Sequence, residues 1–212
     1  MKISIIGTGR MGRTLAALWA QLGHDVFLGS REAAVGQQVV AELGHNIQGG
    51  TQAEAAEFGS ILLFAFPWHA LIDVQRAVGQ LEGKIILDCI NPIMSSGSLA
   101  VGHKWSAGEE IAQQFPRAQV VKAFNTLYVD HLRQPLFGGK PATLYYCSDH
   151  TPAKEATAAL GSQMGLAPVD CGPLKHARYL EPLAVFWLQM AFHMGYGPEF
   201  ALQWVGREGV SG

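Results

Sequence analysis

The sequence predicts an α/β fold in which about eight mostly parallel strands form one sheet with helices on both faces. Short runs rich in isoleucine, leucine and valine alternate with segments of helical spacing along the 212 residues. Such runs are typical of strands buried on both faces, and their alternation with helices is typical of a doubly wound sheet. The second observation is a glycine-rich turn between the first apolar run and the first helical segment.

Composition excludes several classes of protein. Hydrophobic residues make up 49% of the chain and charged residues 15%, which is enough apolar surface for a large core. A net charge of −2 without a long basic run argues against a nucleic-acid partner. No apolar run reaches the roughly 18 residues that cross a membrane, so no membrane partner is expected. The first strand begins at Lys2, which leaves no room for a signal peptide. Three widely spaced cysteines favour a reducing cytoplasm: Cys89, Cys147 and Cys171.

The glycine-rich turn has the pattern G-x-G-x-x-G and joins a strand over residues 3–6 to a helix over residues 14–19. Its members are Gly7, Thr8, Gly9, Arg10, Met11 and Gly12. In this setting the first glycine makes a tight turn, the second lets the backbone approach a pyrophosphate, and the third lets the helix pack closely. The N–H groups that open the helix then face the phosphates. The motif predicts a Rossmann fold that binds a dinucleotide; the alternative is a glycine turn that binds nothing.

The first helix should stop near Gly23, and a second strand over residues 25–28 runs into Gly29, Ser30 and Arg31. Sites that prefer NAD usually carry Asp or Glu here, for the ribose 2′-hydroxyl. This chain has a hydroxyl and a guanidinium instead, which suit a 2′-phosphate. The junction therefore predicts NADP(H) as the cofactor. The alternative is a solvated Ser-Arg turn that opens the next helix.

The remaining elements follow in order along the chain. We expect helices over residues 32–43, 107–115 and 152–164, and a short helix that begins at Thr51, which has capping-box spacing to Glu54. We expect strands over residues 46–48, 61–66, 84–90, 119–124, 143–147 and 167–171. Residues 93–105 are expected to form a loop. The last helical segment, residues 179–196, is apolar nearly all round and must be buried, in the core or in a subunit interface. We therefore expect a dinucleotide-binding core over residues 1–172, a helical C-terminal extension over 173–212 in the same domain, and a homodimer.

Several residues follow the strands at the edge where ligands bind. In open parallel sheets ligands lie beyond the carboxyl ends of the strands, so Phe66, Pro67 and Trp68 are expected to line the cofactor site. Asn91 ends the next strand and is a candidate partner for the nicotinamide carboxamide, because its side chain both donates and accepts. The alternative is that Asn91 only shapes the turn before a proline. A lone histidine in a first helical turn, such as His69, is more often a surface or capping group.

No catalytic set or metal site is expected. The chain has no Tyr-x-x-x-Lys pair, no H-E-x-x-H, no cysteines at zinc spacing and no G-x-S-x-G elbow. Reduction of an alcohol or amine partner normally needs a positioned acid or base. Hydride transfer to a flavin-like ring needs less, because the ring delocalises the charge and takes its proton from water. The absence therefore favours a small-molecule hydride acceptor with such a ring.

The chain resembles the NADP oxidoreductases that use the deazaflavin coenzyme F-420, and also the cytosolic reductase domain of the six-transmembrane epithelial antigen metalloreductases. The likeness extends to about residue 190, and its carriers are residues 7–12, 29–31, 66–68, 121–126, 170 and 172–174. The resemblance implies that Ser30 and Arg31 bind the 2′-phosphate and that residues 66–68 lie beside the nicotinamide. It also implies that Ala123 and Asn125 border the cofactor.

The resemblance further implies that a deazaflavin ring stacks at the turn containing Thr126 and Leu127. The archaeal deazaflavin enzymes carry His where this chain has Asn125, so the second substrate is left open between coenzyme F-420, FMN and FAD. A planar acceptor is expected in one cleft, walled by residues 66–68 and 125–127. Other readings are an NADPH-dependent reductase of an imine, ketone or quinone, and an NADPH-binding sensor without turnover. Imine reductases need a larger helical domain than the forty or so residues after Gly172.

Overall fold

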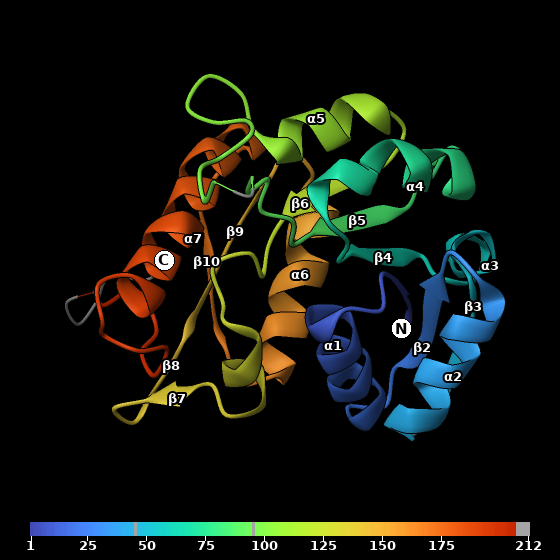
Figure 1. Cartoon of the computed structure of the whole chain (residues 1–212), viewed down its shortest axis with the longest axis horizontal. Helices are drawn as coiled ribbons and strands as arrows, with labels where there is room; N and C mark the ends of the chain where they lie inside the picture. Colours follow the sequence, from blue (N-terminus) through green and yellow to red (C-terminus); the bar gives the residue numbers. More distant parts are fainter. Residues whose placement is uncertain (45, 95, 207–212) are drawn as a thin grey trace.

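The central feature of the fold is one sheet of eight strands in the order β10-β9-β6-β5-β4-β1-β2-β3 (Figure 1). The structure is a computed structural model and describes residues 1–44, 46–94 and 96–206. Neighbouring strands are parallel except β6 and β9, which run antiparallel. The strands are β1 (Lys2–Ile6), β2 (Asp25–Ser30), β3 (Ile47–Thr51), β4 (Ile61–Phe64), β5 (Ile85–Asp88), β6 (Gln119–Lys122), β9 (Thr143–Ser148) and β10 (Ala167–Asp170). The predicted doubly wound, mostly parallel sheet is confirmed.

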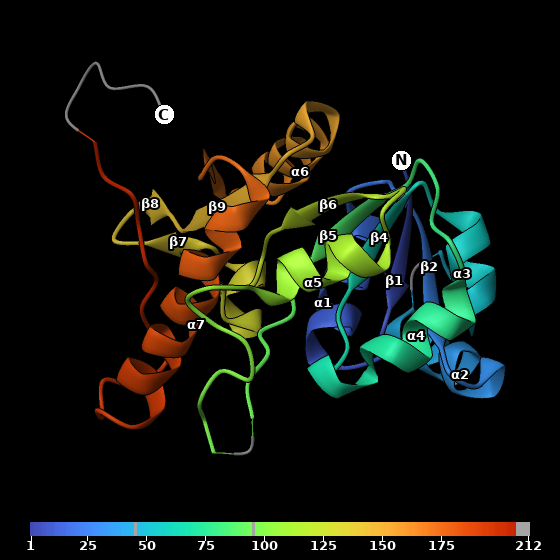
Figure 2. The same cartoon turned by 90° about the horizontal axis from the view of Figure 1, so that it is seen from above.

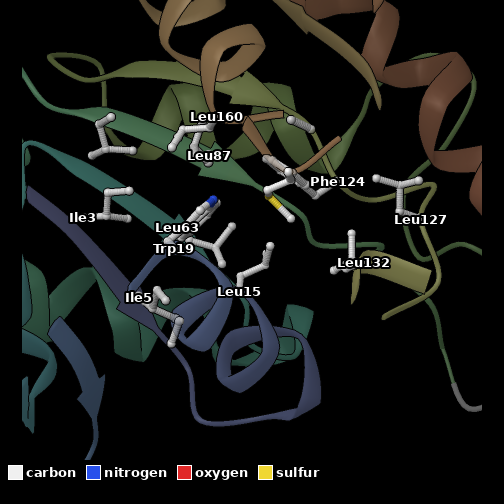
Figure 3. Close-up of a cluster of buried hydrophobic side chains, with 14 of the residues drawn as sticks. Ile3, Ile5, Leu15, Trp19, Leu63, Leu87, Phe124, Leu127, Leu132 and Leu160 are labelled. Atoms are coloured by element: carbon white, nitrogen blue, oxygen red, sulfur yellow. The ribbon is translucent and has the colours of Figure 1, made fainter. Parts of the chain in front are cut away.

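Helices cover both faces of this sheet. They are α1 (Arg10–Gln21), α2 (Ala33–Leu43), α3 (Gln52–Phe58), α4 (Leu71–Val78), α5 (Ala107–Gln114), α6 (Thr151–Gln163) and α7 (Ala177–Phe192), with 3-10 turns η1 (Trp68–Ala70), η2 (Val129–Arg133) and η3 (Leu174–His176). Leu15 and Trp19 of α1 and Leu160 of α6 pack on one face, with Ile3, Ile5 and Leu87 of the sheet (Figure 3). Leu71 of α4 and Ile111 of α5 pack on the opposite face. The carboxyl ends of the parallel strands are left free between these layers.

Local structure follows the predicted signals in most elements and departs from them in a few. The capping box at Thr51 is present, since Glu54 N donates to the Thr51 hydroxyl and Thr51 N donates to the Glu54 carboxylate. Strand β3 extends to Thr51, beyond the predicted residues 46–48. Pro67 opens the turn η1 and not the helix α4 itself, which begins at Leu71. A small hairpin, β7 (Leu136–Phe137) with β8 (Lys140–Pro141), was not predicted.

The C-terminal helix α7 lies at the β9–β10 end of the molecule, with α2 at the other end (Figures 1 and 2). It ends at Phe192, four residues before the predicted end. Only one side of it is buried, because Tyr179 is 69% exposed, Phe186 51% and Phe192 52%. The predicted burial is therefore incomplete within one chain. The division at residue 172 stays a prediction, and residues 207–212 of the predicted extension lie outside the described residues. In the described part of the chain, no helix is long and apolar enough to cross a membrane.

Candidate functional site

Two pockets contain most of the predicted site residues. The first, about 340 Å³ in volume, is lined by Gly7, Thr8, Gly9, Ser30, Arg31, Phe66 and Pro67 of the prediction. The second, about 110 Å³ in volume, is lined by Met11, Asn91, Asn125, Thr126 and Leu127 of the prediction. The single cleft that we expected between residues 66–68 and 125–127 is therefore not seen. Its two walls belong to different pockets because β5 lies between β4 and β6 in the sheet. The residues after β5 consequently lie between them.

The three glycines of the motif play different roles. A Cβ on Gly7 would lie 2.2 Å from the main-chain oxygen of Ala65, and a Cβ on Gly12 would lie 2.2 Å from that of Gly7. Gly7 also has φ of +125°, in the region that favours glycine. Gly7 is needed for the close approach of its turn to the segment after β4, and Gly12 for the close approach of α1 to that turn. A Cβ on Gly9, by contrast, would have no heavy atom of the described residues within 4 Å. Gly9 faces open space and lines the first pocket.

The amino end of α1 is open to an anion. Its N-cap is Gly9, which has no side chain to accept from the first-turn N–H groups, and the first turn holds no acidic residue. The side chain of Arg10 points elsewhere: its Nη2 donates to both carboxylate oxygens of Asp130, at 2.6 and 2.7 Å. The Arg10 guanidinium also lies 5.8 Å from the ring centroid of Tyr128. The N–H groups of this turn are thus available to bind a phosphate, and the Arg10 side chain links α1 to η2.

The residues predicted to select the 2′-phosphate lie in the first pocket. Ser30 is buried at the end of β2, and Arg31 is exposed. Arg31 takes part in none of the ion pairs of the described residues, so its charge is unpaired. The same pocket contains Gln52 and Asp73, which the sequence analysis missed, and His69, which it judged a surface group. Gln52 directly follows β3 at the same sheet edge, but the predicted strand ends at residue 48, so no local signal marked this residue.

Four predicted contact residues lie in neither pocket: Arg10, Gly12, Trp68 and Ala123. The Arg10 side chain is bonded to Asp130, and Gly12 packs against Gly7. Trp68 is half-buried and packs against the hydrophobic cluster on the α4 side of the sheet. Ala123 is fully buried in the cluster on the other side. Both follow a strand at the expected edge, but their side chains turn into the core. Position at a strand end is thus not enough to place a side chain in a pocket.

A reciprocal pair of asparagines lies in the second pocket. Asn91 Nδ2 donates to the main-chain oxygen of Asn125 at 2.8 Å, and Asn125 Nδ2 donates to Asn91 Oδ1 at 3.0 Å. Asn125 Nδ2 also donates to the main-chain oxygen of Leu180 at 3.0 Å. The Asn125 side chain is therefore fixed by its donors. Its Oδ1 is buried and has no hydrogen-bond partner among the described residues.

Aromatic side chains form one wall of the second pocket. Tyr128 and Trp187 are stacked with ring centroids 5.2 Å apart, and Trp187 stacks in turn on Phe200 at 5.1 Å. Trp187 comes from α7 together with Ala184 and Leu188, and none of the three was a predicted site residue. The even apolar pattern of this helix predicts only burial, in the core or in an interface. No local signal in an evenly apolar helix marks the residues that face a ligand.

The second pocket contains no reactive thiol. Cys89 lines it and donates from Sγ to the main-chain oxygen of Phe64 at 3.1 Å. Burial raises the pKa of the Cys89 thiol to about 12, so the thiol stays protonated at neutral pH. Cys89 is therefore a lining group without nucleophilic character.

A buried ion cluster lies close to the second pocket and was also missed. Lys122 Nζ is 2.6 Å from Asp88 Oδ2 and 2.8 Å from Glu181 Oε1, and all three side chains are fully buried. Burial raises the pKa of Asp88. Burial alone would lower the pKa of Lys122, but the two carboxylates raise it above its ordinary value. The available signal was a lysine in an otherwise apolar strand, since a buried charge needs a partner.

Comparison with known proteins places this chain in a family. A family model described as NADP oxidoreductase, coenzyme F420-dependent, matches residues 2–92. The F420-dependent NADP reductase of Methanothermobacter marburgensis is 31% identical over 200 residues, which cover 86% of this chain and 89% of that protein. Metalloreductase STEAP3 of Rattus norvegicus is 30% identical over 182 residues, but the alignment covers only 36% of that longer protein.

A solved structure agrees with these sequence relatives. It is described as a candidate F420-dependent NADP-reductase from Arthrobacter sp. FB24, with 29% identity and a TM-score of 0.88. The superposition covers 98% of this chain and 100% of that one, so α7 belongs to the shared fold. The chain belongs to the family of coenzyme F420-dependent NADP oxidoreductases.

Proposed function

We propose that this protein transfers hydride between NADP(H), held in the first pocket, and a planar ring acceptor of the deazaflavin or flavin type, held in the second. As a member of its family the chain is an NADP-dependent oxidoreductase. The position of the two substrates is our proposal. It assigns the larger pocket to the nucleotide and the aromatic pocket to the acceptor.

The residues of the first pocket fit NADP(H). The open amino end of α1 offers N–H groups to the pyrophosphate, and Gly9 leaves room for its close approach. The unpaired guanidinium of Arg31 and the hydroxyl of Ser30 offer charge and hydrogen bonds to the 2′-phosphate. We assign Gln52 to the adenosine end, because it lines the pocket with these two residues.

One observation carries the acceptor assignment: Asn125, whose buried Oδ1 has no partner among the described residues, lines a pocket with a stacked aromatic wall. A buried acceptor atom without a partner is costly, and an N–H donor on an entering ligand satisfies it. The stacked rings of Tyr128 and Trp187 favour a flat ring as that ligand. Flavin-type rings combine both features, a flat surface and ring N–H groups. Both polar atoms of the Asn91 side chain are bonded to Asn125. The contact of Asn91 with the nicotinamide carboxamide stays a proposal.

The protein then contributes binding and orientation. When bound, NADPH supplies the hydride, and its nicotinamide must lie about 3–3.5 Å from the acceptor for transfer. The adjoining pockets favour that approach, since Met11 of the second pocket comes two residues after Gly9 of the first. Thr126 and Leu127 close the acceptor side of the pocket. After hydride transfer the ring takes up one proton, and we assign that proton to water, because the ring delocalises the charge and needs no positioned acid.

The test combines the protein and NADPH with coenzyme F-420, FMN or FAD in turn and follows the loss of NADPH absorbance. Thr126→Trp fills the second pocket and is expected to abolish turnover while the dissociation constant for NADPH stays within about twofold of the parent's. Thr126→Ser is the matched control, because it keeps the hydroxyl and leaves the pocket open. Equal turnover of the Trp variant and the parent, or a parent that reduces none of the rings, would refute the proposal.

The partners and location that the sequence favours are also proposals. The exposed aromatic side chains of α7 support a homodimer that covers them. The three cysteines are free, which supports a reducing compartment such as the cytoplasm.

A further inference from the structure

We propose that Glu181 is a positioning residue for hydride transfer: through Lys122 it fixes α7 to the sheet edge, so that α7 forms one wall of the acceptor pocket. The inference rests on the proposed function, because it takes the second pocket as the acceptor site. Glu181 itself does not line that pocket. Its role is exerted through the residues around it.

Lys122 is the centre of the cluster. Its Nζ lies 2.6 Å from Asp88 Oδ2 and 2.8 Å from Glu181 Oε1, and donates to the main-chain oxygen of Ile90 at 2.7 Å. The ammonium group thus has one main-chain acceptor and two carboxylates as ion-pair partners. Asp88 Oδ1 also accepts from the N–H of Ile90, at 2.8 Å. The end of β6 is thereby joined to the turn after β5, which leads directly to Asn91 of the acceptor pocket.

Glu181 adds two helices to this cluster. Its Oε2 accepts from the N–H of Ala107 at 3.0 Å and its Oε1 from the N–H of Gly108 at 3.1 Å. These N–H groups belong to the first turn of α5, where a negative charge is stabilised by the helix dipole. One carboxylate thus joins α7, α5 and Lys122. In both views α5 and α7 lie next to each other (Figures 1 and 2).

The cluster reaches the pocket along α7. Ala184 and Leu188 follow Glu181 at three and seven residues, so they lie on the same face of the helix, and both line the pocket. The residue before Glu181, Leu180, offers its main-chain oxygen to Asn125 Nδ2 at 3.0 Å. A shift of α7 therefore moves the pocket wall. It also breaks the hydrogen bond to the main-chain oxygen of Leu180 that helps to fix the Asn125 side chain. Both effects fall on the acceptor and neither on the NADP(H) pocket.

A charged cluster suits a positioning role better than an apolar contact does. Removing charged groups from water is costly, so buried ion pairs add little net stability compared with apolar side chains of the same volume. Its hydrogen bonds are directional, however, and accept one arrangement of the groups that they join. Glu181 receives three donors and is fully buried, so the helix that carries it is held at one height and one rotation.

The test is Glu181→Gln, measured by steady-state kinetics with NADPH and the ring acceptor. Glutamine keeps the shape but has one acceptor oxygen, so its amide nitrogen must face Lys122 or an N–H of α5. The acceptor KM is expected to rise at least about tenfold, while the dissociation constant for NADPH stays within about twofold. The matched control is Glu109→Gln. Glu109 also joins α5 to α7, through Arg178 at 2.6 Å, but in a partly exposed ion pair that does not include Lys122. Its acceptor KM should stay that of the parent.

A second variant tests the same contact without changing a charge. A Cβ on Gly108 would lie 3.2 Å from Ala177 Cβ of α7 and 3.3 Å from Lys122 Cε, so these groups must move apart slightly. Alanine favours a helix over glycine, and α5 itself should not suffer. Gly108→Ala is expected to raise the acceptor KM in the same direction as Glu181→Gln, by a smaller factor. It keeps the proposal testable if the glutamine variant does not fold.

Hydrogen exchange separates this proposal from the proposed function. In Glu181→Gln, faster exchange is expected over residues 180–191, with exchange over residues 2–30 unchanged. The proposal is overturned if the acceptor KM and the exchange of α7 match the parent's. It is also overturned if NADPH affinity changes as much as the acceptor KM, and the exchange of residues 2–30 as much as that of α7. Such a result would mean that the whole protein is destabilised. If the parent reduces no ring acceptor, the proposed function fails, and the exchange of residues 180–191 still decides whether Glu181 positions α7.

Discussion

Asn125 and Asn91 hold each other by two hydrogen bonds, one from each side-chain amide. Asn125 lines the acceptor pocket, and its buried Oδ1 has no partner among the described residues. The pair spans the turns after β5 and β6, which are adjacent strands. Asn125 is held further by Leu180 of α7. The orientation of its Oδ1 is therefore set by three separate parts of the chain.

Asn125→Ala should impair turnover far more than cofactor binding. The substitution removes the proposed partner of the acceptor's N–H and leaves the oxygens of Asn91 and Leu180 without their donor, at about 1–3 kcal/mol each. We expect kcat/KM for the ring acceptor to fall at least about tenfold and the free energy of unfolding to drop by a few kcal/mol. Asn91→Ala is the control: it loosens Asn125 but keeps its Oδ1, so its effect on kcat/KM should be smaller. Equal effects of the two variants would argue against a direct contact from Asn125.

NADPH should be preferred over NADH because of Arg31 and Ser30. A hydrogen bond to a charged group contributes roughly 1.5–3 kcal/mol, so two such contacts give a preference of at least about a hundredfold. Arg31→Ala should weaken NADPH binding sharply and leave NADH binding nearly unchanged, as measured by fluorescence titration. Arg117→Ala is the control, since Arg117 pairs with Glu82 ahead of β6, at the opposite sheet edge. Similar dissociation constants of the parent for the two cofactors would contradict the assignment.

The parts of this molecule that could be predicted are those specified by residues close together in the sequence. The glycine motif, the Ser30–Arg31 junction and the capping box of Thr51 each lie within a few residues, and the structure places all three as expected. The strand pairing at the β9–β10 end of the sheet is not specified by residues close together in the sequence. Strand β9 pairs antiparallel with β6, and the hairpin of β7 and β8 precedes it. The Gly138-Gly139 turn, with φ of +57° and +75°, was an available signal for that hairpin.

The parts that could not be predicted depend on contacts between distant segments. Lys122 meets Asp88 and Glu181 only after β5, β6 and α7 have come together. The acceptor pocket takes a wall from α7, whose apolar residues look alike in sequence. Trp68 and Ala123 are expected at the site because they follow strands, but their side chains pack in or against the hydrophobic core.

The exposed aromatic residues of α7 predict a homodimer. Phe186 and Phe192 are each about half exposed, and apolar patches of this kind mark interaction surfaces. Light scattering at micromolar concentration should give a dimer for the parent and a monomer for the double variant Phe186→Lys, Phe192→Lys. Leu22→Lys, which changes a side chain of similar exposure (43%) after α1, should leave the dimer intact. A monomer mass for the parent would decide against the prediction.

His131 should make the protein less stable in mild acid. Burial lowers the pKa of His131 below its ordinary value, although Glu199 and Asp130 oppose that effect, and its Nε2 has no partner among the described residues. Below a pH of about 6.5 the unfolded chain therefore binds a proton that the folded chain rejects, and stability falls as the pH decreases. The ring lies against Tyr128 and Phe137, so His131→Phe should fit the site and remove the dependence. The loss of Tm between pH values of about 7.5 and 5.5 should be smaller in this variant than in the parent. The exposed His69, changed to Phe, is the control and should keep the full loss.

Gly9 and Gly12 should separate cofactor binding from folding. A methyl group on Gly12 would meet the main-chain oxygen of Gly7 at 2.2 Å, so Gly12→Ala forces α1 away from the sheet and should lower the free energy of unfolding by more than about 2 kcal/mol. A methyl group on Gly9 has open space around it, and Gly9→Ala should fold with nearly the parent's stability. That open space is where the pyrophosphate has to approach the backbone, so Gly9→Ala should raise the dissociation constant for NADPH at least about tenfold. Urea denaturation and fluorescence titration of the two variants measure the two quantities. If Gly9→Ala binds NADPH as well as the parent does, the phosphates do not lie at this turn, and the assignment of the first pocket to NADP(H) has to be abandoned.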